Sequence, residues 1–170
     1  MLSISACSAD AASNFSGEQI RQAHEVAHQL GCPSFVAHQN HYSLVDRTAE
    51  KESLLACREL GLGFVSFAPL VRGLLLGRYR RGEEPAKGSR MERFPGKRPA
   101  PEAFDTVDAV SAFAAERGLS MLQVSLGSLL AREGVTSLLV GASSVEQVRA
   151  NSAAAQWAPT ANDLAALDSL

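Results

Sequence analysis

The residues most able to take part in chemistry follow three predicted strands. The first strand ends at Gln39, the second covers residues 63–67 and breaks at Pro69 into a loop that contains Arg72, and the third runs into residues 141–144. In α/β proteins, ligands bind where the carboxyl ends of the strands meet such loops. Three strand ends with polar or glycine-rich exits therefore predict one shared binding site.

The third strand end favours a phosphate group. Its glycine and serines lead into a helix predicted to begin at Ser144, so backbone amides and the positive end of the helix dipole would point outward. Barrel proteins often bind phosphate in this way after their last strands. Ser144 and Gln147 are equally well explained as partners in a helix cap, and both interpretations stay open.

These strand ends need alternating helices and strands to position them. Capping pairs and periodic apolar residues predict helices at 16–30, 48–60, 104–117, 120–130, 144–154 and 160–170, and apolar runs predict strands at 35–39, 63–67 and 137–140. Residues 70–101 hold glycines, prolines and much positive charge, and are expected to form a long variable basic loop rather than a packed element. The alternation predicts an α/β fold with a parallel sheet or a (β/α) barrel. A dinucleotide-binding glycine loop is excluded, because the glycines at 61 and 63 precede a strand instead of following one.

Composition narrows the class of protein. The 170 residues carry a net charge of -2, which argues against a nucleic-acid partner or an anionic membrane surface. Nine of the 16 Lys and Arg residues fall between Arg72 and Arg98, so that stretch is either a solvated loop or one that faces an anion. The three cysteines, Cys7, Cys32 and Cys57, have no metal-type spacing and predict a reducing, cytoplasmic location without a membrane span.

Two other kinds of site fit the sequence poorly. His24 and His28 lie one helical turn apart, and His38 and His41 flank Gln39, but a zinc site needs three or four convergent ligands. No motif supplies a base for a cysteine nucleophile. We therefore expect neither a metal nor a covalent cysteine mechanism.

A set of motifs in consecutive order resembles the aldo-keto reductase family. They are ASNFS at 12–16, QNHYSL at 39–44, SFAPLVRG at 66–73, GRY at 77–79, GSR at 88–90 and GASSVEQ at 141–147, followed by Asn151. The resemblance covers residues 12–170 and leaves 1–11 unmatched. It implies the carboxyl-terminal half of a (β/α)₈ TIM barrel, roughly strands 6 to 8 with their helices and a final helix. The family reduces small aldehydes and ketones with NADPH, without metal or flavin.

The resemblance also implies a set of cofactor contacts. Ser13, Asn14 and Gln39 match the residues that hydrogen-bond the nicotinamide carboxamide, for which amide side chains are suitable because they both donate and accept. Phe67 matches the aromatic residue that stacks on the nicotinamide. Residues of the loop after it (Ala68, Leu70 and Arg72) match positions along the pyrophosphate, with backbone amides expected to do most of the binding. Positions around the 2′-phosphate and adenine are matched by Gly141, Ser143, Gln147 and Asn151, although Ala150 stands where many members have Glu. A core role for Phe67 and backbone capping by Gln39 are the alternatives.

The same resemblance implies what these 170 residues lack. The family uses a Tyr acid, a Lys, an Asp and a His from the first half of the barrel, and the twelve residues before Ser13 include Asp10 but no Tyr, Lys or His. A (β/α)₈ domain needs about 250 residues. We expect no catalytic residue here, a truncated chain that is inactive alone, and sheet edges open to self-association. The alternatives are a non-catalytic NADPH-binding or barrel-completing interaction module, and an unrelated phosphate-binding (β/α) protein.

Overall fold

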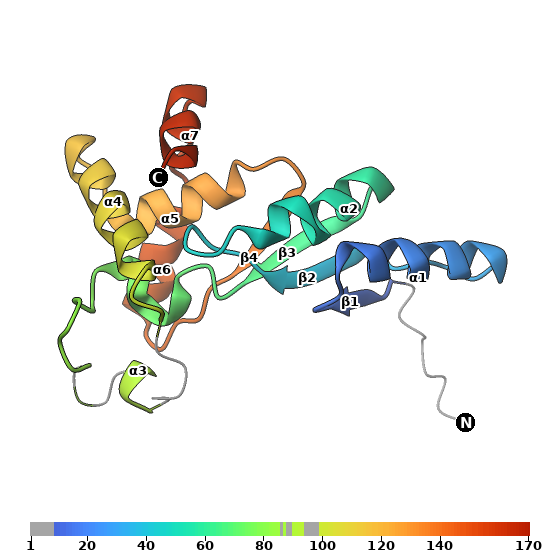
Figure 1. Ribbon diagram of the computed structural model, residues 1–170, viewed down its shortest axis with the longest axis horizontal. Coiled ribbons are helices and arrows are strands. Elements are labelled where there is room, and N and C mark those ends of the chain that lie inside the picture. Colours follow the sequence, from blue (N-terminus) through green and yellow to red (C-terminus); the bar gives the residue numbers. More distant parts are fainter. Residues whose placement is uncertain (1–8, 86, 88–89, 94–98) are drawn as a thin grey trace.

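A parallel sheet of four strands, in the order β1-β2-β3-β4, forms the centre of the molecule (Figure 1). The computed structural model describes residues 9–85, 87, 90–93 and 99–170. The strands are β1 (Ala11–Ser13), β2 (Ala37–His41), β3 (Gly63–Phe67) and β4 (Val135–Leu139). The predicted strand at 63–67 is confirmed. The strand predicted at 35–39 lies two residues later, and the one predicted at 137–140 begins two residues earlier and ends one residue earlier. β1 was not predicted, because a strand of only three residues has no recognisable pattern in the sequence.

Helices connect and follow these strands. They are α1 (Gly17–Gln29), the 3₁₀ helix η1 (Thr48–Lys51), α2 (Ser53–Leu60), the 3₁₀ helix η2 (Val71–Leu76), α3 (Arg90–Arg93), α4 (Ala103–Glu116), α5 (Met121–Leu130), α6 (Val145–Ala154) and α7 (Ala161–Asp168). The capping boxes expected at Ser16, Ser120 and Thr160 are all present, with the N3 side chain returning the hydrogen bond in each. Local capping therefore sets where α1, α5 and α7 begin.

The single helix predicted for residues 48–60 is wrong. It divides into η1 and α2 at Glu52, whose backbone angles (φ -123°, ψ -94°) are not helical. The Glu50 carboxylate accepts hydrogen bonds from the Tyr42 hydroxyl and, at 2.8 Å, from Arg47 Nε, so η1 is fixed against the end of β2 instead of continuing into α2. Polar contacts to the chain just before η1 have overridden the local helical pattern.

Burial alternates along the central strands. His38, Phe64 and Ser66 point toward the helices and are fully buried, whereas Gln39 and Phe67 on the opposite face are half-buried. The main core thus lies between the helices and one face of the sheet. The other face of the strand 63–67 is only partly covered within the described residues.

Part of the basic loop is a packed element. Residues 71–76 form η2, and Leu74 and Leu75 are fully buried in the main core, where η2 contacts α3, α4 and α5. The prediction that this part of 70–101 is unpacked is therefore wrong. The sequence LLL between two glycines was the signal, because a run of leucines is seldom left in solvent. Residues 86, 88–89 and 94–98, including most of the GSR motif, lie outside the described residues.

Candidate functional site

A cleft opens at the carboxyl ends of β3 and β4. Its volume is about 1220 Å³, and it lies between η2 with its following turn and the start of α6. Of the eleven predicted contact residues, eight line this cleft: Phe67, Ala68, Leu70, Arg72, Gly141, Ser143, Gln147 and Asn151. The parallel register of β3 and β4 brings the two segments together, since Phe67 pairs with Leu139 at the cleft edge.

The remaining three predicted residues form a neighbouring group at the ends of β1 and β2. Ser13 pairs with Gln39 in the sheet register, and the Asn14 amide donates to the Gln39 carbonyl at 3.0 Å. Asn14 Nδ2 also donates to Ser13 Oγ at 2.9 Å, and Asn14 adopts a left-handed φ of 62°. This backbone turns the chain sharply out of β1 toward α1. The structure brings these three residues together, but they do not line the cleft.

Phe67 lies between the cleft and the group formed by Ser13, Asn14 and Gln39. It follows Val65, the register partner of Gln39, by two residues on the same face of the sheet. Its ring meets the His41 ring edge-on, with centroids 5.6 Å apart. The Phe67 side chain is half-buried, so it keeps an accessible surface next to both polar groups.

The loop after Phe67 has an unusual backbone. Ala68, Val71 and Arg72 have φ values of 54°, 47° and 56°, in the left-handed region that residues other than glycine seldom adopt. Such strained conformations concentrate at ligand-binding turns and persist only where surrounding packing fixes them. Here the buried leucines of η2 supply that packing.

Some amides of this loop are already used. Val71 N–H donates to the Ala68 carbonyl and Gly73 N–H to the Leu70 carbonyl, both at 2.9 Å. These two amides cannot bind a ligand without first breaking a hydrogen bond. The expectation that backbone amides do most of the binding along 68–73 stays a prediction, and it rests on the amides of this loop other than those of Val71 and Gly73.

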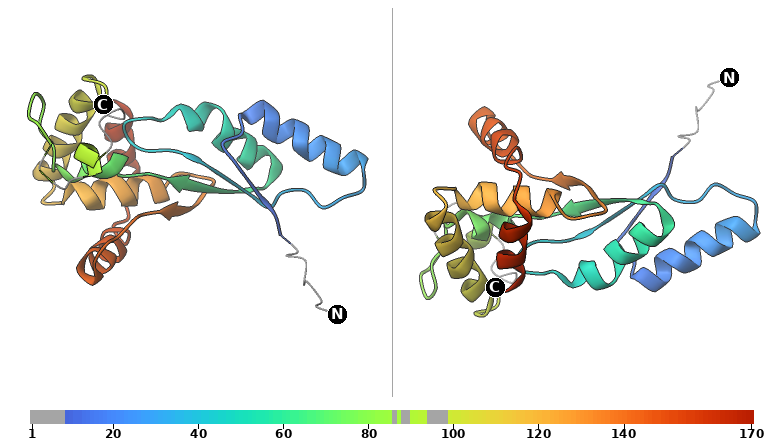
Figure 2. Two further views of the ribbon diagram at one scale, coloured as in Figure 1. Left: turned by 90° about the horizontal axis from the view of Figure 1, so that it is seen from below. Right: turned by 90° about the horizontal axis from the view of Figure 1, so that it is seen from above.

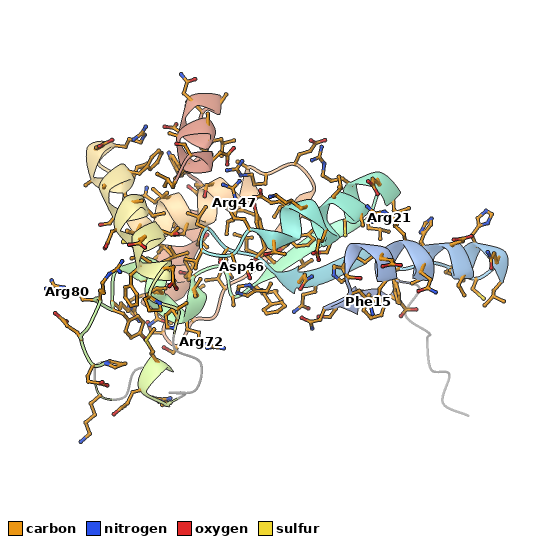
Figure 3. The ribbon with its side chains drawn as sticks, in the orientation of Figure 1. Phe15, Arg21, Asp46, Arg47, Arg72 and Arg80 are labelled. Atoms are coloured by element: carbon orange, nitrogen blue, oxygen red, sulfur yellow. The ribbon has the colours of Figure 1, made fainter. Side chains whose placement is uncertain are left out.

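The cleft has a positive lining. Arg72, Arg78, Lys87 and Arg93 line it, and no Asp or Glu is among its described lining residues. Figure 3 shows Arg72, which belongs to η2, while Arg80, only two residues beyond Arg78, is exposed and lies outside the cleft. A cleft with four cations and no carboxylate favours a polyanionic ligand. Sequence reasoning did not assign Arg78, Lys87 and Arg93 individually; their signal was the cluster of positive charge between 72 and 98.

The start of α6 forms the opposite wall. The Ser144 hydroxyl accepts from the Gln147 amide, as predicted, but the Gln147 side chain accepts from Ser143 N–H at 2.8 Å rather than returning to Ser144. The Glu146 carboxylate lies over the same helix end, and hydrogen bonds from its own amide and from the Ser144 hydroxyl lower its pKa. A phosphate at this helix end would therefore meet an ionised carboxylate as well as the positive helix dipole.

The tyrosines of the described chain differ in their surroundings. Tyr42 is fully buried, and burial, followed by its hydrogen bond to Glu50, raises its pKa. Tyr79 lines the cleft, with its hydroxyl 3.5 Å from the Arg72 carbonyl. Tyr42 is thus held in a structural network with Glu50 and Arg47, outside the cleft. No group of three or more potential metal-ligating side chains occurs within the part of the chain that the structure describes.

The fold and the cleft define an α/β protein with a parallel four-stranded sheet, helices packed on the sheet, and a cleft at the carboxyl ends of two of its strands. A model of the aldo/keto reductase family matches residues 7–170, and the chain belongs to this family. The unrelated phosphate-binding protein considered from the sequence is therefore excluded. Among the described residues, none of the helices is both long and apolar enough to cross a membrane.

Relatives of known sequence agree with this assignment. The chain is 33% identical over 145 residues to the L-glyceraldehyde 3-phosphate reductase of Escherichia coli O157:H7, covering 82% of this chain and 42% of that protein. It is 34% identical over 138 residues to the uncharacterized oxidoreductase YrpG of Bacillus subtilis, covering 81% and 40%. It is 27% identical over 144 residues to a probable voltage-gated potassium channel subunit beta of Oryza sativa, covering 82% and 44%. The chain thus matches less than half the length of each of these relatives.

Proposed function

We propose that this chain supplies the cofactor-binding half of an aldo/keto reductase, and that a complete barrel containing it reduces small aldehydes or ketones with NADPH. The observation that carries the proposal is the cleft at the ends of β3 and β4, lined by four cations and no carboxylate among the described residues. A dinucleotide with its phosphates is a polyanion of the size such a cleft accommodates.

The nicotinamide and the phosphates of the cofactor suit different parts of the site. The aromatic face of Phe67 offers a stacking surface for a nicotinamide ring, and Asn14 and Gln39 offer amide groups to its carboxamide. Arg72 and Arg78 offer positive charge to the phosphates. When bound, NADPH supplies the hydride that adds to the carbonyl carbon, while a separate acid must protonate the carbonyl oxygen.

We further propose that the 170 residues alone do not catalyse this reduction. The proton donor must reach the carbonyl oxygen, and Tyr42 is instead buried against Glu50. Tyr79 does line the cleft, but it lies in the loop after β3, away from the positions that carry the family's acid. Cofactor binding without turnover is therefore the expected behaviour of the isolated chain.

Two measurements on the purified chain test these statements separately. Fluorescence titration with NADPH is expected to saturate, and the absence of saturable binding would contradict the cofactor assignment. A steady-state assay with NADPH and an aromatic aldehyde is expected to show no enzyme-dependent turnover. Measurable turnover would overturn the proposal of inactivity but leave the cofactor site intact. The same titration with NADH determines whether the 2′-phosphate contributes to affinity.

A second candidate is a non-catalytic, cofactor-binding interaction module. The observation in its favour is the similarity to a protein named as a probable potassium channel subunit beta, alongside relatives named as reductases. This candidate predicts cofactor binding that persists without turnover even when the missing barrel half is supplied in trans. Recovery of aldehyde reduction on such complementation would favour the reductase.

A location in the reducing cytoplasm is also proposed. Cys32 and Cys57 are both free thiols, and burial raises the pKa of Cys57 to about 11. A buried thiol of this kind is chemically inert. Localisation of the fluorescently tagged full-length protein would test the statement.

A further inference from the structure

A histidine and an aspartate form a pair beside Phe67. His41 is the last residue of β2, and it lies opposite Phe67 in the register of the sheet, with the two ring centroids 5.6 Å apart. Alternate residues of a strand share one face, so His41 lies on the same face as Gln39. Its Nδ1 is 3.1 Å from Oδ2 of Asp46, and the side chain is partly exposed. The pair is therefore next to the aromatic ring proposed to stack on the nicotinamide.

The turn after β2 fixes the Asp46 carboxylate (Figure 3). The Ser43 amide donates to the Asp46 carbonyl at 3.0 Å, and the Asp46 amide donates to Ser43 Oγ at 3.1 Å. Oδ1 of Asp46 accepts from the Thr48 amide at 3.1 Å, which leaves Oδ2 for His41. Ser43 itself is fully buried. A carboxylate held by backbone groups in this way has its orientation set before any ligand binds.

The Asp46 carboxylate carries a negative charge at neutral pH. Partial burial raises its pKa, but the hydrogen bonds from Thr48 and His41 lower the pKa by more, so that it lies below the ordinary value. An ionised carboxylate can only accept hydrogen bonds, so His41 Nδ1 is the donor of the contact between the two side chains. The imidazole is thereby held in one orientation against Phe67.

The neighbouring cation, Arg47, does not neutralise Asp46. Its guanidinium pairs with Glu50 at 2.8 Å and with Asp168 at 2.6 Å. Asp168 also pairs with Arg132, so two cations and two carboxylates form a group that is neutral in itself. Figure 2 shows the chain after β2 reaching α7, which carries Asp168, before it turns back into η1 and α2. The negative charge of Asp46 therefore acts on the sheet face beside β2 without compensation from Arg47.

We propose that Asp46, held against His41, raises the affinity of the site for the oxidised nicotinamide cofactor relative to the reduced one. The inference rests on the proposed function, in which the nicotinamide stacks on Phe67. When bound, the oxidised ring carries a positive charge and the reduced ring carries none. A fixed carboxylate near this ring attracts only the charged form. Both forms have the same phosphates, so the attraction between the phosphates and the cations of the cleft cancels in the ratio of the two dissociation constants.

Isothermal titration calorimetry of the purified chain with NADP⁺ and with NADPH tests the proposal. The measured quantity is the Kd of NADPH divided by the Kd of NADP⁺. Asp46→Asn keeps an acceptor for the Thr48 amide but removes the charge, and it is expected to lower this ratio about 2- to 5-fold at low salt, through weaker binding of NADP⁺ alone. Asp46→Ser also removes the charge and keeps a hydroxyl acceptor, so it should give the same change. Asp108→Asn is the matched control, because it removes an equal charge from an exposed position of α4.

The outcomes separate this inference from the proposed function. If the wild type binds neither cofactor, the proposed function fails and the inference fails with it. If both cofactors bind but the ratio is unchanged in the two Asp46 variants, only the inference is overturned. An equal loss of affinity for both cofactors would also overturn it, because Asp46 would then act on the shape of the turn and not on the charge of the ring. An equal fall of the ratio in Asp108→Asn would overturn it as well, since the effect would then belong to the net charge of the chain.

Discussion

Substitution of Gly127 by alanine tests how α5 is held against the chain that leaves α6. Gly127 lies in the buried middle of α5, and an added Cβ would come within 2.8 Å of Trp157 Cε3 and closer still to the Trp157 carbonyl oxygen. Alanine favours a helix over glycine by about 1 kcal/mol. Overpacking against a backbone carbonyl, which no rotamer change relieves, costs typically about 1–3 kcal/mol. Because the added Cβ would lie far inside van der Waals contact with the Trp157 carbonyl oxygen, the upper part of that range, about 2–3 kcal/mol, applies. After the helix gain is subtracted, we expect Gly127→Ala to lower the free energy of unfolding by about 1–2 kcal/mol.

Urea unfolding followed by circular dichroism measures this change as a lower midpoint with an unchanged slope. The matched control is Ser111→Ala, an exposed position of α4 where only helix propensity acts, and it should leave stability unchanged or raise it by up to about 0.5 kcal/mol. A Gly127→Ala protein as stable as the wild type, or more stable, would contradict the close approach of Trp157 to Gly127.

Three further predictions concern single side chains. Burial lowers the pKa of His38 from 6.5, and its ring nitrogens have no hydrogen-bond partner among the described residues. As the pH falls below about 6.5, this histidine is protonated in the unfolded chain before it is protonated in the folded one, so the free energy of unfolding decreases. The urea midpoints at pH 7.5 and pH 5.5 should therefore differ for the wild type and differ much less for His38→Leu. The Asp168 carboxylate accepts hydrogen bonds from Arg132 at 2.6 and 3.0 Å and from Arg47 at 2.6 Å, which anchors α7. Asp168→Asn should therefore speed amide hydrogen exchange in α7 without affecting α1. Equal exchange rates in α7 of the wild type and of the variant would contradict this anchoring. Glu146→Gln removes a carboxylate from the N-terminal end of α6. The variant should bind NADPH about 2- to 5-fold more tightly, while its affinity for NADH stays nearly unchanged. An equal change in affinity for both cofactors would show that the 2′-phosphate binds elsewhere.

Local rules made much of the fold predictable from the sequence. Ser16, Ser120 and Thr160 each begin a helix with a reciprocal cap, since that interaction needs only residues three apart. The strand at 63–67 is a continuous apolar run bounded by Gly61 and Pro69, and it appears as predicted. What failed depended on contacts beyond the three- and four-residue spacing of a helix. η1 and α2 separate because Glu50 is held by Tyr42, eight residues earlier, and β1 forms because β2 provides hydrogen-bonding partners for a segment with no strand signal of its own.

The candidate site was only partly predictable for the same reason. Motif order was enough to select Phe67 and Asn151, which lie on opposite walls of one cleft. It could not show that the Val71 and Gly73 amides are used within their own loop, because those hydrogen bonds follow from left-handed backbone angles at non-glycine residues. Nor could it separate Arg78, which lines the cleft, from Arg80, which does not. The side chains of an irregular loop that face a cleft are determined by how the loop packs, in this case by the buried leucines of η2.

We propose that a nicotinamide dinucleotide binds along the ends of β3 and β4, and chemical-shift mapping of the ¹⁵N-labelled chain during NADPH titration is the direct test of this binding. The expected result is a saturable set of shifts confined to residues 67–79 and 141–151, with smaller changes at Asn14 and Gln39, and affinity reduced about 2- to 10-fold in Phe67→Ala through loss of ring stacking. Shifts confined to other parts of the chain, or none at millimolar NADPH, would contradict the claim.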